Sequence, residues 1–191
     1  MIDLKEYIRE VPHFPKEGVL FKDMWPLLRN PTAWNEAIDQ LGNFCDDVNA
    51  DCIVGIDARG FVVGSALAMK KNLPFVPIRK QGKLPGNLFG REYDLEYGRD
   101  TLEIQNDSFV KTTRVLLVDD LLATGGTIGT AIILLGLANA KVVGCGFVIE
   151  LLGLNGRNYI KDIPVKSLVT YDDLWNICYS NNILWRVCQK N

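Results

Sequence analysis

The sequence predicts an α/β protein in which helices flank a mostly parallel central sheet. Short apolar runs of strand length alternate along the chain with segments of helical spacing. Each run is apolar at consecutive positions, which suits strands that are buried on both faces of a parallel sheet. Strand–helix–strand repetition therefore predicts this fold class, and it places the expected site at the carboxyl ends of the strands.

Five runs are candidate strands, and the last has the weakest pattern. They are residues 52–56, 75–78, 115–118, 142–149 and 165–169. The first predicted helix begins at Asn30, because an asparagine N-cap precedes Pro31 and apolar residues then recur at helical spacing. Residues 61–71 and 127–138 are the other predicted helices, and their small residues would allow close packing on a sheet.

The stretch from Arg79 to about Asp100 fits neither pattern. It contains glycines, a Pro85-Gly86 turn signal and many charges. A long connection of this composition in a compact domain is usually a functional lid or a linker, and its aromatic residues argue against a plain linker. This stretch is therefore a candidate for a functional lid.

Charge and composition limit the classes of ligand. The 191 residues include 21 Lys and Arg against 23 Asp and Glu, which gives a formal net charge of -2. With 48% hydrophobic and 23% charged residues, the chain can bury the core of one domain. So small a net charge gives no bulk attraction to nucleic acid or to an acidic membrane, and any bound anion must be held by a local site. The single histidine, His13, excludes a metal site built from a histidine cluster.

The cysteines and the apolar stretches predict a cytoplasmic protein. The five cysteines are odd in number and show no Cys-x-x-Cys spacing, which argues against a disulfide scaffold or a zinc ribbon. We expect thiols in a reducing compartment, several of them in the core. The N-terminus lacks the apolar run of a signal peptide, and the longest apolar stretch, residues 131–138, is too short to span a membrane.

The chemistry is expected in the segment VLLVDDLLATGGT, residues 115–127. A buried strand leads to two acids, Asp119 and Asp120, and then to a run of small residues and a helix. Small residues let backbone N–H groups close around a phosphate, and the helix N-terminus adds its positive dipole. The acids would repel that phosphate, so we expect them to face hydroxyl groups or a bound divalent cation.

Other interpretations of this segment fit less well. The chain has neither the GxxxxGK[ST] P-loop nor the GxGxxG dinucleotide fingerprint. The strand alone resembles a Walker B strand, but it has no Walker A partner. A plain glycine-rich turn would bury two consecutive acids without a partner, which is unfavourable.

The segment resembles the motif with which type I phosphoribosyltransferases bind phosphoribosyl pyrophosphate (PRPP). Its LLATGGT portion is similar to that of the adenine-specific members. The likeness covers the chain from about Tyr7 to Asp172 and continues, in the expected order, at residues 14–23, 55–61, 78–86 and 95–98. Several separate motifs agree, so the resemblance is more specific than any one of them.

The resemblance implies the type I phosphoribosyltransferase fold and its reaction. A catalytic domain of residues 1–172 would carry an N-terminal base-binding hood at about residues 7–30 and a flexible lid over about residues 80–103. Residues 173–191 would form an extension of unknown role, which we expect to pack on the domain. The implied reaction is purine salvage: the 5-phosphoribosyl group of PRPP passes to adenine, giving AMP and pyrophosphate. Mg²⁺ would arrive with PRPP rather than on protein ligands, and the implied partner is a second copy in a homodimer.

The resemblance also assigns roles at the sugar-phosphate end of the site. The 5′-phosphate would be held by Ala123, Thr124, Gly125, Gly126 and Thr127. The ribose hydroxyls would be held by Asp119 and Asp120. The pyrophosphate would be held by Asp57, Ala58, Arg59, Arg79, Lys80 and Lys83, of which Lys80 is the weaker candidate. A cis peptide bond is implied near Asp57-Ala58.

The remaining roles concern the base and the chemical step. Glu96 would assist proton transfer as N9 of adenine attacks, and Tyr97 would help to close the lid. Adenine would contact Leu20, Phe21, Lys22 and Arg59. Lys22 stands where the family often has arginine, and a lysine lacks the planar fork of a guanidinium group.

Two alternatives stay open. One is a purine phosphoribosyltransferase for xanthine, guanine or hypoxanthine, although the ATGGT, DARGF and LEYG segments favour adenine. The other is a regulator that binds PRPP without catalysis, which would be expected to carry an added nucleic-acid-binding domain or a basic face. Incubation with PRPP, Mg²⁺ and each purine base would separate the three.

Overall fold

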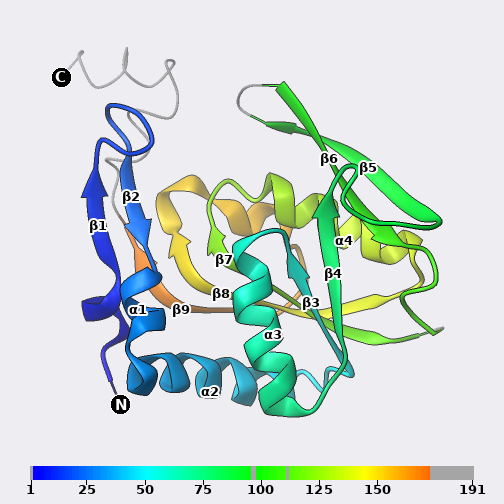
Figure 1. The fold of residues 1–191 in the computed structure, drawn as a ribbon, viewed down its shortest axis with the longest axis horizontal. Coiled ribbons are helices and arrows are strands. Elements are labelled where there is room, and N and C mark those ends of the chain that lie inside the picture. The colour runs from blue at the N-terminus through cyan, green and yellow to red at the C-terminus, as the bar shows by residue number, and fades with distance from the viewer. Residues whose placement is uncertain (1, 96–97, 111, 173–191) are drawn as a thin grey trace.

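A seven-stranded sheet forms the centre of the part of the chain that the computed structural model describes, residues 2–95, 98–110 and 112–172 (Figure 1). The strand order is β5-β6-β4-β3-β7-β8-β9. Five strands pair in parallel: β4 (Phe75–Lys80), β3 (Cys52–Ile56), β7 (Arg114–Leu122), β8 (Lys141–Leu151) and β9 (Val165–Tyr171). The predicted fold class, a mostly parallel α/β sheet, is confirmed.

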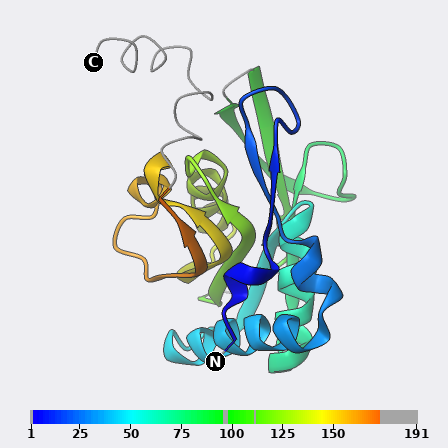
Figure 2. The ribbon, with the colours of Figure 1, turned by 90° about the vertical axis from the view of Figure 1, so that its left-hand side faces the viewer.

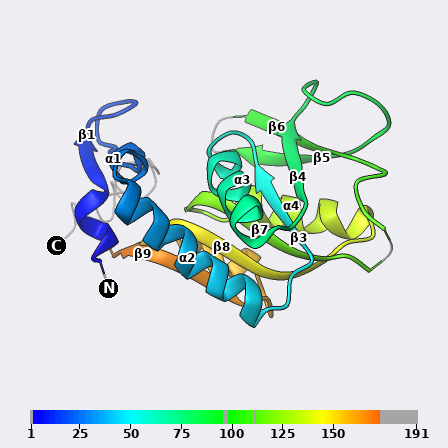
Figure 3. The ribbon, with the colours of Figure 1, turned by 60° about the horizontal axis from the view of Figure 1, so that its bottom comes forward.

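Three helices cover the two faces of this sheet. The helices α2 (Pro31–Asp47) and α3 (Arg59–Lys71) lie on one face, where α2 crosses β8 and β9 and α3 lies on β3 and β7 (Figure 3). The helix α4 (Gly126–Leu137) lies on the other face. Successive residues of β7 supply the two cores, because Leu116 packs with α2 and α3 while Leu117 packs with α4.

The hood is a small layer at the β9 end of the sheet. It consists of the 3₁₀ turn η1 (Leu4–Tyr7), the antiparallel hairpin of β1 (Arg9–Pro12) and β2 (Leu20–Asp23), and the short helix α1 (Trp25–Arg29). Figure 2 shows this hairpin standing on the side of the molecule toward which the parallel strands point. Asp23 fastens its base, because one carboxylate oxygen accepts from Arg9 and the other accepts from the Trp25 N–H at 2.9 Å.

The predicted elements agree with the structure except at one place. All five candidate strands are present, and the Asn30 cap is confirmed because its side chain accepts from the Ala33 N–H at 3.0 Å. The expected lid loop is instead largely a hairpin, in which β5 (Leu88–Leu95) pairs antiparallel with β6 (Gly98–Gln105) and β6 pairs with β4. The sequence pattern did not indicate these strands, because they contain glycines and many charged residues. The hairpin that they form is an antiparallel extension at the edge of the sheet.

The three cysteines that the structure describes are buried thiols, as the sequence predicted for several of them. Cys45, Cys52 and Cys145 are free and buried, and burial raises the pKa of Cys52 to about 11 and that of Cys145 to about 12. The other two cysteines, Cys178 and Cys188, lie outside the described residues. Within the described ranges, no helix combines the length and the apolar character needed to cross a membrane.

Candidate active site

The acid pair lies near the carboxyl end of β7, between the first turn of α3 and the hood. The strand continues through Asp119 and Asp120 as far as Leu122, four residues beyond the predicted run. Asp119 lies directly against Gly60: a Cβ atom on that glycine would be 2.8 Å from Asp119 Oδ1. Asp120 is buried, and its Oδ2 lies 2.7 Å from Nε of Arg59.

A further negative charge, such as that of a phosphate, would be unfavourable beside these two acids. Burial raises the pKa of Asp119 well above its ordinary value, and the neighbouring Asp120 raises it further. Burial also raises the pKa of Asp120, but the Arg59 guanidinium opposes this effect. The pair is therefore suited to accept hydrogen bonds from hydroxyl groups or to face a cation, and unsuited to hold a phosphate.

A small cavity opens beside the acid pair, at the junction of β7 and α4. It has a volume of about 80 Å³, and it is lined by Asp119, Leu121, Leu122, Ala123, Thr124, Gly125, Thr127 and Ile128. Gly125 is the N-cap of α4 and has a φ of 87°, a conformation that favours glycine. The cavity thus combines small residues, hydroxyls and a helix N-terminus, which together suit a phosphate group.

Cationic side chains meet at the carboxyl ends of β3 and β4. The buried Asp57 carboxylate accepts from Nε of Arg79 at 3.2 Å and from Nζ of Lys83 at 3.4 Å. The peptide bond that follows it, Asp57-Ala58, is cis, as the resemblance implied. Arg79 also donates to the Lys83 carbonyl oxygen at 3.1 Å, so the cations form one cluster.

An apolar pocket of about 140 Å³ lies between the hood and the carboxyl ends of β7 and β8. It is lined by Val19, Leu20, Phe21, Lys22, Leu121, Leu151 and Leu154. The Phe21 ring is held from two directions: the edge contact to Phe14 has a centroid distance of 5.1 Å, and Cζ of Arg59 lies 5.5 Å from the Phe21 centroid. A flat apolar ligand would find an aromatic face and aliphatic walls here.

Comparison with known proteins identifies this arrangement. Residues 27–179 match the phosphoribosyl transferase domain family. The adenine phosphoribosyltransferase of Prochlorococcus marinus (strain MIT 9313) is 54% identical over 171 residues, which cover 89% of this chain and 99% of that protein. The chain belongs to the adenine phosphoribosyltransferase family.

Solved structures of this family show the same fold. The adenine phosphoribosyltransferase of Thermoanaerobacter pseudethanolicus superposes with a TM-score of 0.84 at 42% identity, covering 88% of this chain and 98% of that one. The Saccharomyces cerevisiae adenine phosphoribosyltransferase, solved with adenine and an imino-altritol bisphosphate, gives a TM-score of 0.81 at 40% identity, covering 86% of this chain and 96% of that one. The type I phosphoribosyltransferase fold expected from the sequence is confirmed.

Most of the expected site residues of this phosphoribosyltransferase lie along one edge of the sheet. The acid pair, the loop of residues 123–127, Arg59, Asp57, Arg79 and Lys83 all lie at or beyond the carboxyl ends of β3, β4 and β7. Glu96 and Tyr97 fall between β5 and β6 in the chain and lie outside the described residues.

Two lysines make ion pairs that the sequence did not predict. Lys80 does not join Arg79 and Lys83, because successive strand residues point to opposite faces; its Nζ lies 2.8 Å from Asp100 Oδ2 on β6. The Lys22 side chain is 1% exposed, and its Nζ lies 2.5 Å from Glu10 Oε1 and 3.8 Å from the Tyr171 ring centroid. Lys22 lines the pocket, but its ammonium group is directed into the hood.

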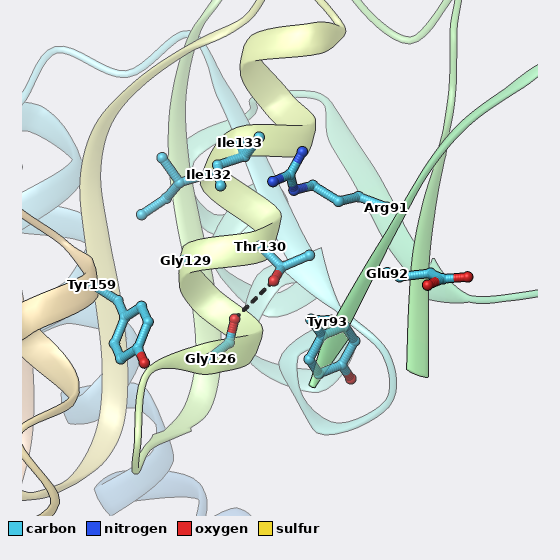
Figure 4. A pocket seen from close by; sticks show the side chains of 9 residues that line it. All are labelled: Arg91, Glu92, Tyr93, Gly126, Gly129, Thr130, Ile132, Ile133 and Tyr159. Atoms are coloured by element: carbon cyan, nitrogen blue, oxygen red, sulfur yellow. Dashed lines mark hydrogen bonds between the residues drawn. The ribbon is translucent and has the colours of Figure 1, made fainter. Parts of the chain in front are cut away.

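Some residues of the site were not foreseen from the sequence. Leu121, Leu151 and Leu154 form the aliphatic wall of the hood pocket. Tyr93 on β5 lies beside the phosphate loop, since its hydroxyl interacts with both Thr127 and Asp100. Figure 4 shows its ring facing the first turn of α4. Two signals in the sequence pointed to this group: Leu121 directly follows the acid pair, and Tyr93 is one of the aromatic residues in the stretch after Arg79.

Proposed function

We propose that this site transfers the 5-phosphoribosyl group of PRPP to adenine, giving AMP and pyrophosphate, in purine salvage. One observation carries the proposal: Leu121 lines both the phosphate cavity and the apolar hood pocket. A base and a 5′-phosphate, the two ends of AMP, can therefore occupy adjoining cavities with the acid pair beside them. Family membership supports the same reaction.

The 5′-phosphate binds in the loop of Ala123, Thr124, Gly125, Gly126 and Thr127. Backbone N–H groups and the two threonine hydroxyls supply the donors, and the N-terminus of α4 supplies a favourable dipole. Asp119 and Asp120 accept from the ribose hydroxyls. Burial raises the pKa of both carboxylates, so hydrogen bonds from the ribose hydroxyls would stabilise their ionised forms.

The departing pyrophosphate binds near Asp57, Ala58 and the cations Arg79 and Lys83. The side chains of Arg79 and Lys83 are 33% and 48% exposed, so they can turn from Asp57 toward a ligand. They stabilise the negative charge that develops on the leaving group. Lys80 stays with Asp100 in this scheme, and Arg59 stays between Asp120 and Phe21.

Adenine binds in the hood pocket against Phe21, with the Leu20 backbone reading its amine-bearing edge. The S. cerevisiae relative was solved with adenine, which supports a base of this kind. Glu96 assists proton transfer as N9 attacks, and Tyr97 helps to cover the site. Exclusion of water protects the cationic sugar from hydrolysis during the transfer.

Mg²⁺ suits this site as an ion that arrives with PRPP. Within the described ranges, no group of three or more His, Cys, Asp or Glu side chains is arranged to hold a metal. In this proposal, Asp119 and Asp120 would accept hydrogen bonds from the ribose hydroxyls that coordinate the ion, rather than coordinate it themselves. When bound, Mg²⁺ neutralises part of the pyrophosphate charge.

The wider organisation follows the same family pattern. Residues 1–172 form the catalytic domain, and residues 173–191 form an extension. A second copy of the chain is the proposed partner, and the half-exposed Ile133 and Leu137 of α4 are surfaces that such a partner could cover. Three buried free thiols support a reducing compartment, the cytoplasm.

One assay tests the function. The protein is incubated with PRPP, Mg²⁺ and adenine, hypoxanthine, guanine or xanthine in turn, and nucleotide formation is followed. Rapid formation of AMP alone is the expected result. Preferential formation of another nucleotide would assign a different purine base, and the absence of any turnover would favour a PRPP-binding regulator.

A further inference from the structure

A buried carboxylate that the reaction does not use lies next to the phosphate loop. Glu150 is near the end of β8, beside Leu122 of β7 in the strand register, and it is 3% exposed. Nε and Nη2 of Arg157 donate to its two oxygens, each at 2.7 Å. Ser167 Oγ adds a third bond, to Oε2 at 2.6 Å.

Arg157 belongs to a turn that backs the phosphate loop. This turn, η3 (Gly156–Tyr159), packs so closely that a Cβ on Gly156 would come within 2.8 Å of Leu122 Cδ1 and nearer still to the Ala123 carbonyl oxygen. A Cβ on Gly125 would lie 2.8 Å from Tyr159 Cδ2. Figure 4 shows the Tyr159 ring beside the first turn of α4, at Gly126 and Gly129.

We propose that Glu150 and Arg157 are positioning residues for the 5′-phosphate of PRPP. The bidentate ion pair fixes η3 relative to β8, and η3 in turn fixes the backbone of Ala123 and Gly125, two residues of the loop proposed to hold the phosphate. The chemistry fits this role, because a guanidinium–carboxylate fork specifies orientation as well as distance. The inference rests on the proposed function, since it assigns the loop to that phosphate.

The electrostatics agree with a permanently formed pair. Burial alone would raise the pKa of Glu150, but the hydrogen bonds from Arg157 and Ser167 outweigh it and lower the pKa below its ordinary value. The carboxylate is therefore ionised and paired at neutral pH. Arg157 is 52% exposed, so loss of Glu150 leaves a solvated cation, whereas loss of Arg157 leaves a buried anion. Glu150→Gln is accordingly the milder variant.

The test separates positioning of the phosphate from general stabilisation of the fold. In Glu150→Gln we expect the KM for PRPP and the Kd of ribose 5-phosphate to rise about tenfold. Loss of a residue that orients the groups of a binding site commonly weakens binding by about this factor. We expect the KM for adenine at saturating PRPP to stay within twofold, because no residue of η3 is among those described as lining the hood pocket. Calorimetric titration with ribose 5-phosphate reads the phosphate loop without the base.

Matched variants sharpen the result. Arg157→Lys keeps the charge but loses the fork, so it should fall between the wild type and Glu150→Gln. Gly156→Ala keeps every charge but displaces η3 from Ala123, and it should reproduce the PRPP-specific loss. Lys70→Met is the control, because it breaks the exposed 2.6 Å ion pair between Lys70 of α3 and Asp39 of α2, on the other face of the sheet. Both KM values and the Kd of ribose 5-phosphate should stay within twofold.

Three outcomes would overturn the inference. A folded Glu150→Gln variant with unchanged PRPP and ribose 5-phosphate constants would do so, as would an equal rise in the KM for adenine. If Glu150→Gln does not fold, Ser167→Ala removes a single bond, and an unchanged KM for PRPP in that variant would refute the positioning role. Failure of the wild type to make AMP would instead refute the proposed function.

Discussion

The two anion-binding regions of the site are built on different principles. The cavity at the start of α4 is formed by backbone and small residues, and the residues described as lining it include no lysine or arginine. The region at the ends of β3 and β4 relies on Arg79 and Lys83, which are paired with Asp57. In the proposed function, the first region would hold the phosphate that remains on the product, and the second would hold the group that leaves.

This difference teaches how a fixed and a departing group can be handled in one site. Backbone donors cannot move far, so they hold the sugar phosphate in one position throughout the reaction. Partly exposed side chains can exchange a carboxylate for pyrophosphate and then return to the carboxylate. In this proposal, Asp57 is the partner of both cations when no pyrophosphate is bound.

The largest expected effect is in the region at the ends of β3 and β4, which is proposed to bind the departing pyrophosphate. Arg79→Met should lower kcat about 100-fold or more, because one donor to the developing charge is lost. The Kd of ribose 5-phosphate should stay within twofold, since that ligand lacks the pyrophosphate. Rapid-quench measurement of AMP formation checks the first value and calorimetry checks the second. A parallel rise in the ribose 5-phosphate Kd would show that the two regions are not independent.

The next largest effect concerns the cavity at the start of α4, which is proposed to bind the 5′-phosphate. Gly125→Ala forces a side chain onto a φ of 87° and against Tyr159, so we expect kcat/KM for PRPP to fall about 100-fold through displacement of the loop. Here ribose 5-phosphate binding should weaken as well, which distinguishes this variant from Arg79→Met. Steady-state kinetics and calorimetry measure both. A variant with wild-type kinetics would mean that the loop tolerates movement.

A smaller effect should appear in stability rather than rate. The pKa of Asp119 is raised above its ordinary 3.8, so its ionisation destabilises the free protein, and stability falls as the pH rises through the raised pKa. Asp119→Asn should therefore increase the Tm of the ligand-free protein at pH 7 by about 3 °C, roughly 1 kcal/mol, while activity falls. Calorimetric scans from pH 4 to 8 measure the change, with Asp39→Asn as an exposed control.

The smallest expected effect is a control within α4 itself. A Cβ at Gly136 would meet no atom within 4 Å, so Gly136→Ala should stabilise the protein by about 0.5–1 kcal/mol and leave kinetics unchanged. Thermal unfolding and the AMP assay check both points. A loss of activity would show that the whole helix, and not only its first turn, supports the phosphate loop.

The sequence predicted those parts of the molecule whose pattern is local. Strands buried on both faces leave continuous apolar runs, as in β3 and β7, and the Asn30 cap lies directly beside the helix that it starts. The loop proposed to bind the phosphate could be located for the same reason, since its strand, acids and small residues follow one another in the chain.

Features that depend on distant pairing could not be predicted in this way. The β5–β6 hairpin is held by pairs such as Gly90 with Glu103, and neither residue is typical of a strand. Predicting that Lys80 and Arg79 point to opposite faces would have required knowing that β4 continues as far as Lys80. In the sequence, the leucines of the hood pocket cannot be distinguished from ordinary core residues, because three separate elements of the fold bring them together.

The contact between Gly60 and Asp119 limits how this protein can be engineered. Alanine in place of a helical glycine is a common route to heat resistance, because it reduces the freedom of the unfolded chain. At Gly60 the added methyl group would meet the very carboxylate proposed to hold the ribose, and at Gly64 it would lie 2.6 Å from the Phe75 ring. A programme of thermostabilisation should therefore work along the far end of α4 and leave the start of α3 untouched.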